Sequence, residues 1–372
     1  MFENLQIPEN LRPQDPRFGS GPSLVPVDFV KNLAKTDVHL LGTSHRKAPV
    51  KNLVKDIQEG LRKYFNVPSD YTIVLGNGGA TFLFDMIALG MVDKSITHYT
   101  CGEFSKKWFK SSKIVPWIEA KEVSVDFGQG ITAQDDPASD VIAITLNETS
   151  TGVQIDQLPT ISQGSLLAID ATSGGGQCPC DVSKTDFYFF SPQKVFASEG
   201  GLFVGIMSPA ARQRVLKIAE DKSRYIPGIM DWKVCIDNSD KHQTYNTPAI
   251  STLFFLREQI NLMNKDGYEA VMAQSQKKAD LVYGWAQEKD YLSCYIQESK
   301  YRSVAVATID VDERVDVNGL LKTLEDQKLV YGIDAYRKLG RNQFRIAMFH
   351  NISYDDLQKL TKLLSFAIES KL

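Results

Sequence analysis

The stretch AIDATSGGG at residues 168–176, followed by FYFFSPQKVFASEGG at residues 187–201, decides the fold. Each segment opens with apolar residues and then turns polar, and the polar residues include Asp170 and Lys194. Apolar runs without alternation predict strands that are buried on both faces, as in parallel sheets covered by helices. Because ligands of open α/β sheets bind beyond the carboxyl ends of the strands, we expect both side chains to meet one ligand.

The surrounding sequence repeats this alternation of strands and helices. A glycine turn at 76–79 separates a strand-like run from a helical one, and Ser208-Pro209 opens another helix with an N-cap serine. Interleaved strands and helices predict a largely parallel α/β sheet. The expected strands are 71–75, 140–146, 166–170, 187–190 and 201–207, and the first expected helix is 81–91.

The C-terminal third shows a second alternation, which predicts a smaller α/β domain. Two long helical runs are separated by the helix breaker NKDG at 264–267. The expected elements are helices at 247–263, 268–289, 317–329 and 354–372 and strands at 302–311 and 344–349. We therefore expect an N-terminal arm at 1–20, a large cofactor-binding domain at 21–265 and a small C-terminal domain at 266–372.

Composition excludes several classes of protein. The 372 residues contain 42 Lys and Arg, 45 Asp and Glu, and 43% apolar residues, so the chain is neither disordered nor drawn electrostatically to nucleic acid. No apolar run is long enough to span a membrane, and the polar, proline-containing start does not resemble a secretory signal. Five cysteines are too few for a disulfide framework, and no metal site is predicted, so we expect a cytoplasmic protein with reduced thiols.

The lysine and the aspartate together suggest a carbonyl cofactor. A lysine amine can form a Schiff base with such a cofactor, and pyridoxal phosphate also needs a carboxylate at its ring nitrogen, a phosphate cradle and a face for its ring. Asp170 could supply the carboxylate, the turn Gly78-Gly79-Ala80-Thr81 the cradle, Phe104 the ring face and Thr149 a hydrogen bond to the phenolic oxygen.

Each of these residues also has an ordinary structural interpretation. An aspartate that ends a strand is usually a turn residue, a single lysine is usually solvated, and Phe104 could belong to the core. The glycine turn lacks both the GxGxxG pattern and a Walker lysine. The spacing alone therefore leaves the cofactor open.

Several sequence motifs that follow one another in a fixed order narrow the choice of protein family. With them the chain resembles the phosphoserine aminotransferase family, which consists of fold-type I, class V pyridoxal-phosphate enzymes, and it looks closest to the actinobacterial branch. The motifs are RFGSGPS (17–23), GTSHRKAPV (42–50), VLGNGGAT (74–81), NETSTG (147–152), DATSG (170–174), PQK (192–194), QTYNTPA (243–249) and YRKLGRNQFRIAMF (336–349).

The resemblance implies a role for each matching residue. The cofactor residues are the Schiff-base Lys194, the ring-nitrogen partner Asp170, Thr149 at the phenolic oxygen, Gln193 at the phosphate, and Asn246 and Thr247 reaching the cofactor phosphate of a neighbouring subunit. The substrate residues are His45 and Arg46 at the anionic side group and Arg345 at the α-carboxylate. A homodimer with shared active sites is also implied.

The chain departs from the family pattern at three places. Phe104 stands where the family has a stacked tryptophan, and Ala80 stands where it has an arginine. Lys338-Leu339 replaces a histidine–arginine pair, so Lys338 and Arg341 are the candidate cations for the substrate phosphate.

The implied reaction is a transamination in serine biosynthesis. The amino group of L-glutamate would pass to 3-phosphohydroxypyruvate to give O-phospho-L-serine and 2-oxoglutarate, with Lys194 as general acid–base. A phosphorylated 2-oxo acid of pyridoxine biosynthesis is a second implied substrate. The alternatives are an alanine–glyoxylate aminotransferase, a cysteine desulfurase using Cys294 in LSCYI (292–296), and a non-catalytic pyridoxal-phosphate-binding protein.

Overall fold

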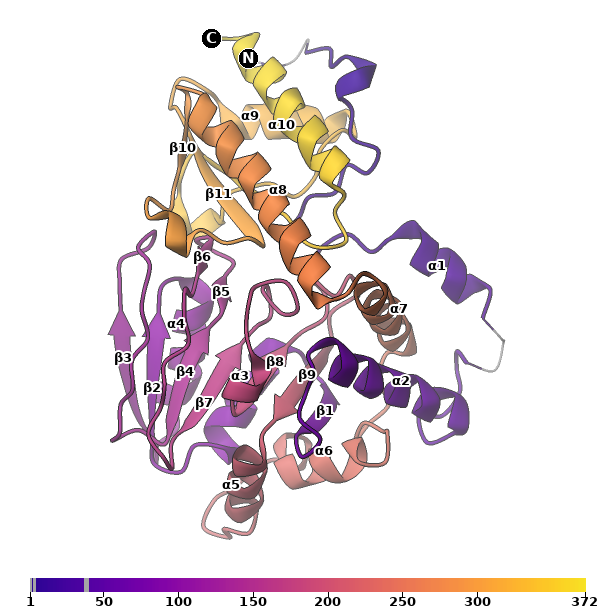
Figure 1. Ribbon diagram of the computed structural model, residues 1–372, viewed down its shortest axis with the longest axis vertical. Helices are drawn as coiled ribbons and strands as arrows, with labels where there is room; N and C mark the ends of the chain where they lie inside the picture. The colour runs from indigo at the N-terminus through magenta and orange to yellow at the C-terminus, as the bar shows by residue number, and fades with distance from the viewer. Residues whose placement is uncertain (1, 3–4, 37–39) are drawn as a thin grey trace.

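The computed structural model describes residue 2, residues 5–36 and residues 40–372, and it has two lobes (Figure 1). The large lobe contains a seven-stranded sheet, and the small lobe contains a three-stranded sheet. The strands of the large sheet are β1 (Thr72–Asn77), β2 (Ser95–Thr100), β3 (Glu119–Ser124), β4 (Val141–Thr145), β7 (Leu166–Asp170), β8 (Phe187–Phe190) and β9 (Leu202–Met207).

The large sheet is mainly parallel, which confirms the expected fold class. Its strand order is β1-β9-β8-β7-β4-β2-β3, and only β9 runs antiparallel to its neighbours. The sequence pattern did not predict β2 and β3. The strand β2 is buried but contains threonine and histidine, and β3 is a largely exposed edge strand.

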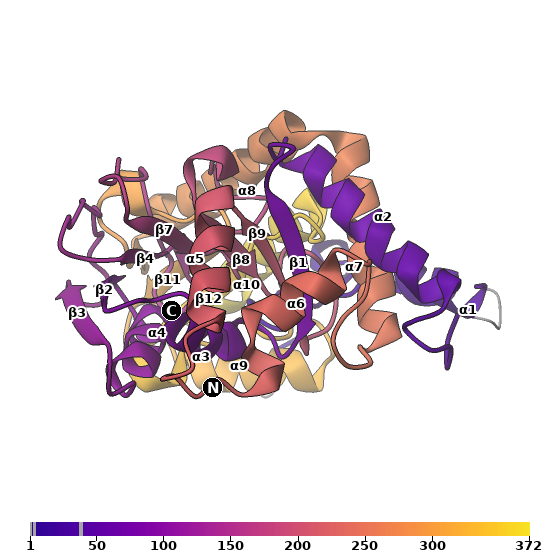
Figure 2. The ribbon, with the colours of Figure 1, turned by 90° about the horizontal axis from the view of Figure 1, so that it is seen from below.

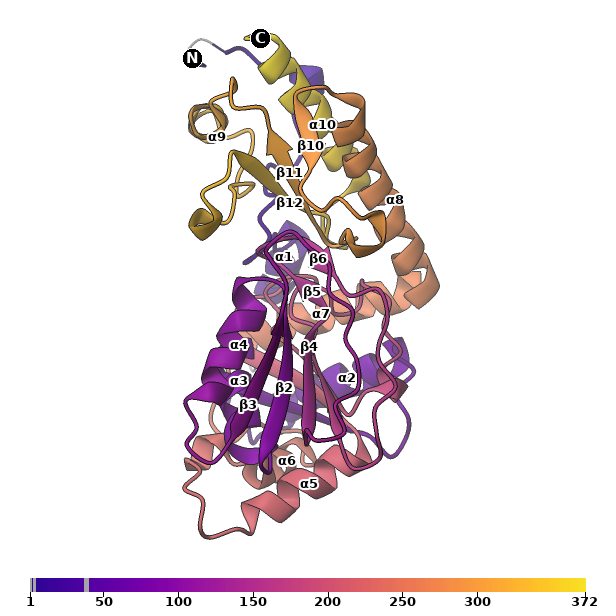
Figure 3. The ribbon, with the colours of Figure 1, turned by 90° about the vertical axis from the view of Figure 1, so that its left-hand side faces the viewer.

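Helices cover both faces of this sheet, which explains the continuous apolar strands. In β4, Ile142 and Ile144 face one apolar core, whereas Val141 and Ala143 face the other. The first core includes α2 (Ala48–Tyr64) and α7 (Ile250–Asp266), which lie side by side (Figure 2). The opposite face carries α3 (Ala80–Gly90), α4 (Glu103–Lys113), α5 (Pro209–Ala219) and α6 (Trp232–Ser239) (Figure 3).

The small lobe follows Gly267, where a positive φ of 88° separates two long helices. Its strands are antiparallel, in the order β10-β11-β12. Its elements are α8 (Tyr268–Glu288), β10 (Leu292–Cys294), η4 (Ser299–Tyr301), β11 (Val306–Val311), α9 (Val317–Asp326), η5 (Arg337–Leu339), β12 (Gln343–Ala347) and α10 (Tyr354–Glu369).

The remaining elements are η1 (Glu9–Leu11), α1 (Val27–Ala34), β5 (Asn147–Glu148), β6 (Val153–Gln154), η2 (Val182–Lys184) and η3 (Gly228–Met230).

The N-terminal segment is irregular, as its prolines predict, and it packs against the small lobe. Phe18 is fully buried, and its backbone N–H donates to the carbonyl of Tyr331 at 3.0 Å. The backbone N–H of Gln14 donates to Asp356, near the start of α10, at 2.6 Å. Within the described residues, every helix is too short or too polar to cross a membrane.

Candidate active site

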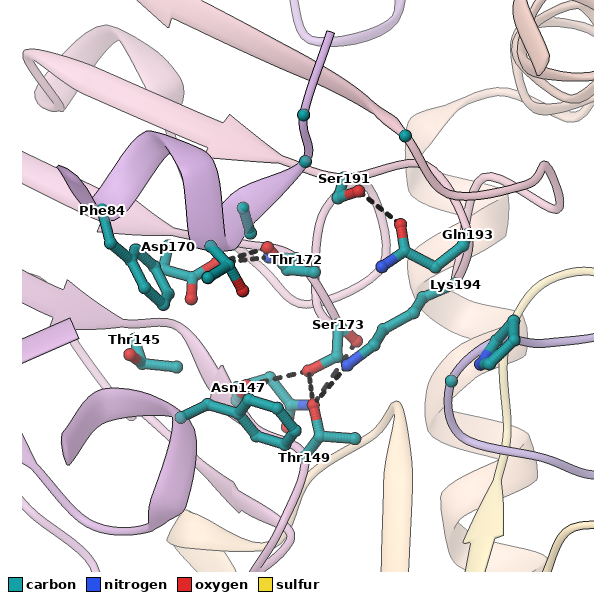
Figure 4. A pocket seen from close by; sticks show the side chains of 18 residues that line it. Phe84, Thr145, Asn147, Thr149, Asp170, Thr172, Ser173, Ser191, Gln193 and Lys194 are labelled. Atoms are coloured by element: carbon teal, nitrogen blue, oxygen red, sulfur yellow. Dashed lines mark hydrogen bonds between the residues drawn. The ribbon is translucent and has the colours of Figure 1, made fainter. Parts of the chain in front are cut away.

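A cavity of about 250 Å³ lies at the carboxyl ends of β4, β7 and β8 (Figure 4). This is the edge of the sheet where an open α/β fold binds its ligand. Eight of the ten predicted cofactor residues line it: Gly79, Ala80, Thr81, Phe104, Thr149, Asp170, Gln193 and Lys194. The structure therefore brings together residues that are more than 100 positions apart in the chain.

Lys194 is held inside this cavity by two neighbours. Its side chain is buried, its Nζ donates to Thr149 Oγ1 at 2.8 Å, and Nζ lies 5.0 Å from the centre of the Phe104 ring. Burial lowers the pKa of Lys194 to about 8, although the negative charge of Asp170 opposes this shift. A lysine with such a pKa can exchange protons near neutral pH.

Asp170 ends β7 and is also buried. Burial raises the pKa of Asp170 to about 6, while hydrogen bonds from Thr172 act in the opposite direction. The Thr172 backbone N–H and hydroxyl both donate to Asp170 Oδ1, at 2.9 and 2.5 Å. A cationic ring nitrogen beside this carboxylate would compensate its buried charge.

Five polar residues of the cavity lining were missed in the sequence, and three of them, Asn147, Thr172 and Ser173, lie inside the quoted motifs. Thr172 holds Asp170, and Ser173 Oγ accepts hydrogen bonds from Thr149 Oγ1 at 2.7 Å and from Asn147 Nδ2 at 2.8 Å. The Thr149 hydroxyl is thus oriented between Ser173 and the lysine amine. Proximity to Asp170 and Thr149 in the motifs DATSG and NETSTG was the available signal.

The glycine turn opens α3 toward the cavity. Gly78 and Gly79 have positive φ angles of 134° and 94°, which favour glycine, and no side chain caps the first turn of α3. An uncapped helix N-terminus presents backbone N–H groups to an anion. Lys107 Nζ donates to Thr81 Oγ1 at 3.0 Å and brings a cation to this turn, near Ala80.

Arg345 is a cation without a counter-ion. It lies on β12, and its side chain makes no hydrogen bond or ion pair with any described residue; its buried Nε has no partner. Its Cζ lies 5.5 Å from the centre of the Tyr336 ring, and burial lowers the pKa of the guanidinium. The positive charge also acts on Lys194, which places Arg345 in the electrostatic environment of the amine. The negative charges of Asp334 and Glu148 oppose the lowering of the Arg345 pKa without an ion-pair contact, so an anionic ligand would stabilise the guanidinium further.

Two further predicted cations, Lys338 and Arg341, already form ion pairs within the chain. Arg341 forms a bidentate contact with Asp310, at 3.0 and 2.6 Å. Lys338 Nζ lies 2.8 Å from Glu103 Oε2, in the first turn of α4. Glu103 directly precedes Phe104, which lines the cavity, so the partner of Lys338 is adjacent in sequence to a lining residue.

Seven predicted residues, including Arg345, Lys338 and Arg341, do not line the cavity, and the other four gather elsewhere on the surface. Thr247 Oγ1 lies 3.1 Å from His45 Nδ1, next to Arg46, and Asn77 Nδ2 donates to the carbonyl oxygens of Asn246 and Thr247. His45 Nε2 is buried and has no hydrogen-bond partner among the described residues, and burial lowers the pKa of this histidine. We name His45, Arg46, Asn246 and Thr247 the His45 corner.

The donors around the cavity fit pyridoxal phosphate. The cavity combines an amine, a carboxylate, an aromatic face and an open helix N-terminus. In its wall, the buried Thr145 Oγ1 and Asn147 Oδ1 have no hydrogen-bond partner in the part of the chain that the structure describes. Cys294 lies in β10 and does not line the cavity, so it offers no support for a desulfurase.

Comparison with known proteins agrees with this chemistry. The chain matches the family Aminotransferase class-V over residues 18–331. It is 42% identical over 366 residues to a phosphoserine aminotransferase of Corynebacterium glutamicum, covering 98% of this chain and 97% of the relative. A phosphoserine aminotransferase of a Nocardioides species is 39% identical over 374 residues, covering 99% of this chain and 100% of the relative.

A solved structure supports the fold. The phosphoserine aminotransferase of Cytophaga hutchinsonii superposes with a TM-score of 0.85 at 23% identity, covering 95% of this chain and 99% of that chain. The expected fold-type I architecture is thereby confirmed. From these matches we conclude that the chain belongs to the class-V aminotransferase family.

Proposed function

We propose that this protein is a phosphoserine aminotransferase, which transfers the amino group of L-glutamate to 3-phosphohydroxypyruvate. The observation that carries the proposal is the convergence of Lys194 and Asp170 on one cavity at the carboxyl ends of the sheet. The names of the relatives at about 40% identity support this substrate pair. The phosphorylated 2-oxo acid of pyridoxine biosynthesis is a second proposed substrate.

The cavity would hold pyridoxal phosphate through the residues that line it. Asp170 would hold the ring nitrogen protonated, and the Thr149 hydroxyl, turned away from Ser173, would donate to the phenolic oxygen. Phe104 offers a π-face, and the N-terminus of α3 with Gln193 would hold the phosphate. When bound, this cofactor supplies an aldehyde that takes up the amino group and a ring that accepts electrons.

Lys194 would move the proton in each half-reaction. The pKa of about 8 means that Nζ can accept a proton from the substrate Cα and return it near neutral pH. Thr149 holds the amine in place at 2.8 Å, and burial keeps bulk water from competing for the proton.

Arg345 would bind the α-carboxylate, which both substrates carry. A guanidinium binds a carboxylate through two parallel charge-assisted hydrogen bonds, and Arg345 has no competing partner among the described residues. For the substrate phosphate we propose Lys338 rather than Arg341, because Asp310 already occupies the fork of Arg341. Glu103 is a single-contact partner that a phosphate dianion could replace.

The His45 corner would serve the active site of a second subunit. Within one chain these residues do not line the cavity around Lys194, and Asn246 and Thr247 are exposed. We therefore propose a homodimer with shared sites, in which the His45 corner contacts the partner's cofactor and substrate phosphates. The substrates are small molecules; we propose no nucleic-acid or membrane partner and a cytoplasmic location.

A visible spectrum of the purified protein, recorded before and after addition of L-glutamate, tests the proposal. We expect the absorbance of a lysine-bound aldehyde cofactor, replaced by that of its amine form. O-phospho-L-serine should drive the same change, whereas L-alanine should do so poorly, which separates this activity from that of an alanine–glyoxylate aminotransferase. A colourless protein after incubation with pyridoxal phosphate, or an unchanged spectrum with glutamate, would refute the proposed function.

A further inference from the structure

The helix α4, which carries Phe104, receives its N-terminal cap from a distant segment. Its N-cap residue is Gly102, which has no side chain that could accept a hydrogen bond. The first backbone N–H, of Glu103, donates to Ser150 Oγ at 3.0 Å. The next two, of Phe104 and Ser105, donate to the carboxylate of Glu148 at 3.3 and 2.8 Å. Glu148 and Ser150 thus supply what a capping side chain normally supplies.

Glu148 is fully buried and is used only as an acceptor. Besides the two helix N–H groups, its carboxylate contacts the backbone N–H and hydroxyl of Ser150, at 3.2 and 2.7 Å, and the hydroxyl of Ser105, at 2.9 Å. None of these five partners is a cationic side chain. A buried carboxylate without an ion-pair partner is costly, and here backbone and hydroxyl donors together with the helix dipole stabilise it.

The position of Glu148 and Ser150 also explains why residue 102 is a glycine. Its φ of 176° is extended backbone that any residue adopts, so the conformation does not require glycine. A Cβ at this position would lie 2.4 Å from Glu148 Cγ and 2.6 Å from Ser150 Oγ. The carboxylate therefore occupies the space of a local capping side chain.

The segment that caps α4 also holds the reactive amine. Thr149 lies between Glu148 and Ser150 and accepts the hydrogen bond from Lys194 Nζ. The Phe104 ring, in the first turn of α4, lies 5.0 Å from the same Nζ. The tripeptide 148–150 therefore determines both contacts of Lys194. Thr149 contacts the amine directly, and the residues on either side of Thr149 cap the helix that carries Phe104.

We propose that Glu148 is a positioning residue of the active site: its carboxylate fixes α4, and thereby sets the Phe104 ring relative to Thr149 and Lys194. Glu148 does not line the cavity, so it acts through Phe104 rather than by touching cofactor or substrate. The inference rests on the proposed function insofar as Phe104 faces the cofactor ring.

The charge of Glu148 has a second effect, which acts on Lys194 directly and does not depend on Phe104. This negative charge raises the pKa of Lys194, as does Asp170, whereas burial and the Arg345 charge lower it to about 8. Removing the charge at position 148 should therefore lower the pKa of the Lys194 amine further. Cofactor capture by the apoenzyme requires the unprotonated amine, so its pH midpoint reports this shift.

The test compares Glu148→Gln with Asp316→Asn. Asp316 also caps a helix with its carboxylate, accepting from the Gly319 N–H at 2.9 Å, but it lies in the small lobe and does not line the cavity. We measure the affinity of each apoenzyme for pyridoxal phosphate by absorbance titration, and the rate of capture against pH. Glu148→Gln should weaken binding roughly tenfold and lower the pH midpoint, and Asp316→Asn should change neither.

A double-mutant cycle with Phe104→Ala shows whether Glu148→Gln weakens cofactor binding by displacing the Phe104 ring. If it does, adding Glu148→Gln to Phe104→Ala should weaken binding by less than about twofold. Should Glu148→Gln fail to fold by circular dichroism, Ser150→Ala replaces it. That milder variant removes one acceptor of the α4 N-terminus, and we expect about threefold weaker binding that again disappears with Phe104→Ala.

The outcomes separate this inference from the proposed function. A wild-type protein that does not bind pyridoxal phosphate would refute both. Normal wild-type binding and transamination, with Glu148→Gln indistinguishable from Asp316→Asn or with an equal effect in the Phe104→Ala background, would refute the positioning role alone.

Discussion

Replacing Arg345 by leucine should weaken substrate binding strongly without destabilising the fold. The guanidinium makes no hydrogen bond or ion pair with any described residue, so its removal breaks no internal contact of that kind. Loss of a partly buried, unpaired cation should change the free energy of unfolding by less than about 1 kcal/mol. A residue that is structurally dispensable yet charged is expected to serve a ligand.

The functional cost follows from the contact that Arg345 is free to make. Two charge-assisted hydrogen bonds to a carboxylate, at about 1.5–3 kcal/mol each, amount to roughly 3–6 kcal/mol. That energy corresponds to a factor of about 10² to 10⁴ in the affinity for glutamate. Because the Arg345 charge also lowers the pKa of Lys194, the pH midpoint for cofactor capture should move upward in Arg345→Leu.

The assay is the absorbance change of the glutamate half-reaction across substrate concentrations, together with thermal unfolding of the apoenzyme. The matched control is Arg314→Leu, an exposed arginine of the same lobe that pairs with Asp312 at 2.8 Å. The control should leave glutamate affinity unchanged. If Arg345→Leu lost several kcal/mol of stability, or if its glutamate half-reaction were normal, the assignment of Arg345 to the α-carboxylate would be wrong.

Three further predictions follow from the site. The pKa of Asp170, raised to about 6 in the folded apoenzyme, lies above that of an unfolded aspartate, so stability falls as pH rises from about 4 through 6. Asp170→Asn should remove this loss, worth about 3 kcal/mol at pH 7.5, when thermal unfolding is measured at about pH 4 and about pH 7.5, and an identical pH profile for both proteins would contradict the assignment. Lys338→Met should raise KM for 3-phosphohydroxypyruvate about tenfold and leave that for glutamate unchanged in steady-state assays, and equal effects on both would exclude a phosphate contact. An equal mixture of Lys194→Ala and Thr247→Ala chains should regain roughly a quarter of wild-type turnover, because about half of its dimers are hybrids with one intact site each; a mixture as inactive as its parents would argue against shared sites.

The sequence predicted those parts of the fold where burial alone selects the residues. The strands β7 and β8 match the expected runs, because strands covered on both faces require apolar residues at every position. The strand β2 escaped prediction although it is equally buried. It contains His98, whose ring is hydrogen-bonded to Ser112, a partner fourteen positions away that a local pattern does not indicate.

The same distinction between local pattern and distant contact applies to the site residues. Lys194 and Asp170 follow apolar runs, and parallel strands place their carboxyl ends at one edge, so their meeting was predictable from local sequence. The unpaired state of Arg345 and the capping of α4 by Glu148 were not predictable. Both depend on which charged groups the packed lobes bring within reach of one another, and such contacts between distant segments are determined only when the tertiary structure forms.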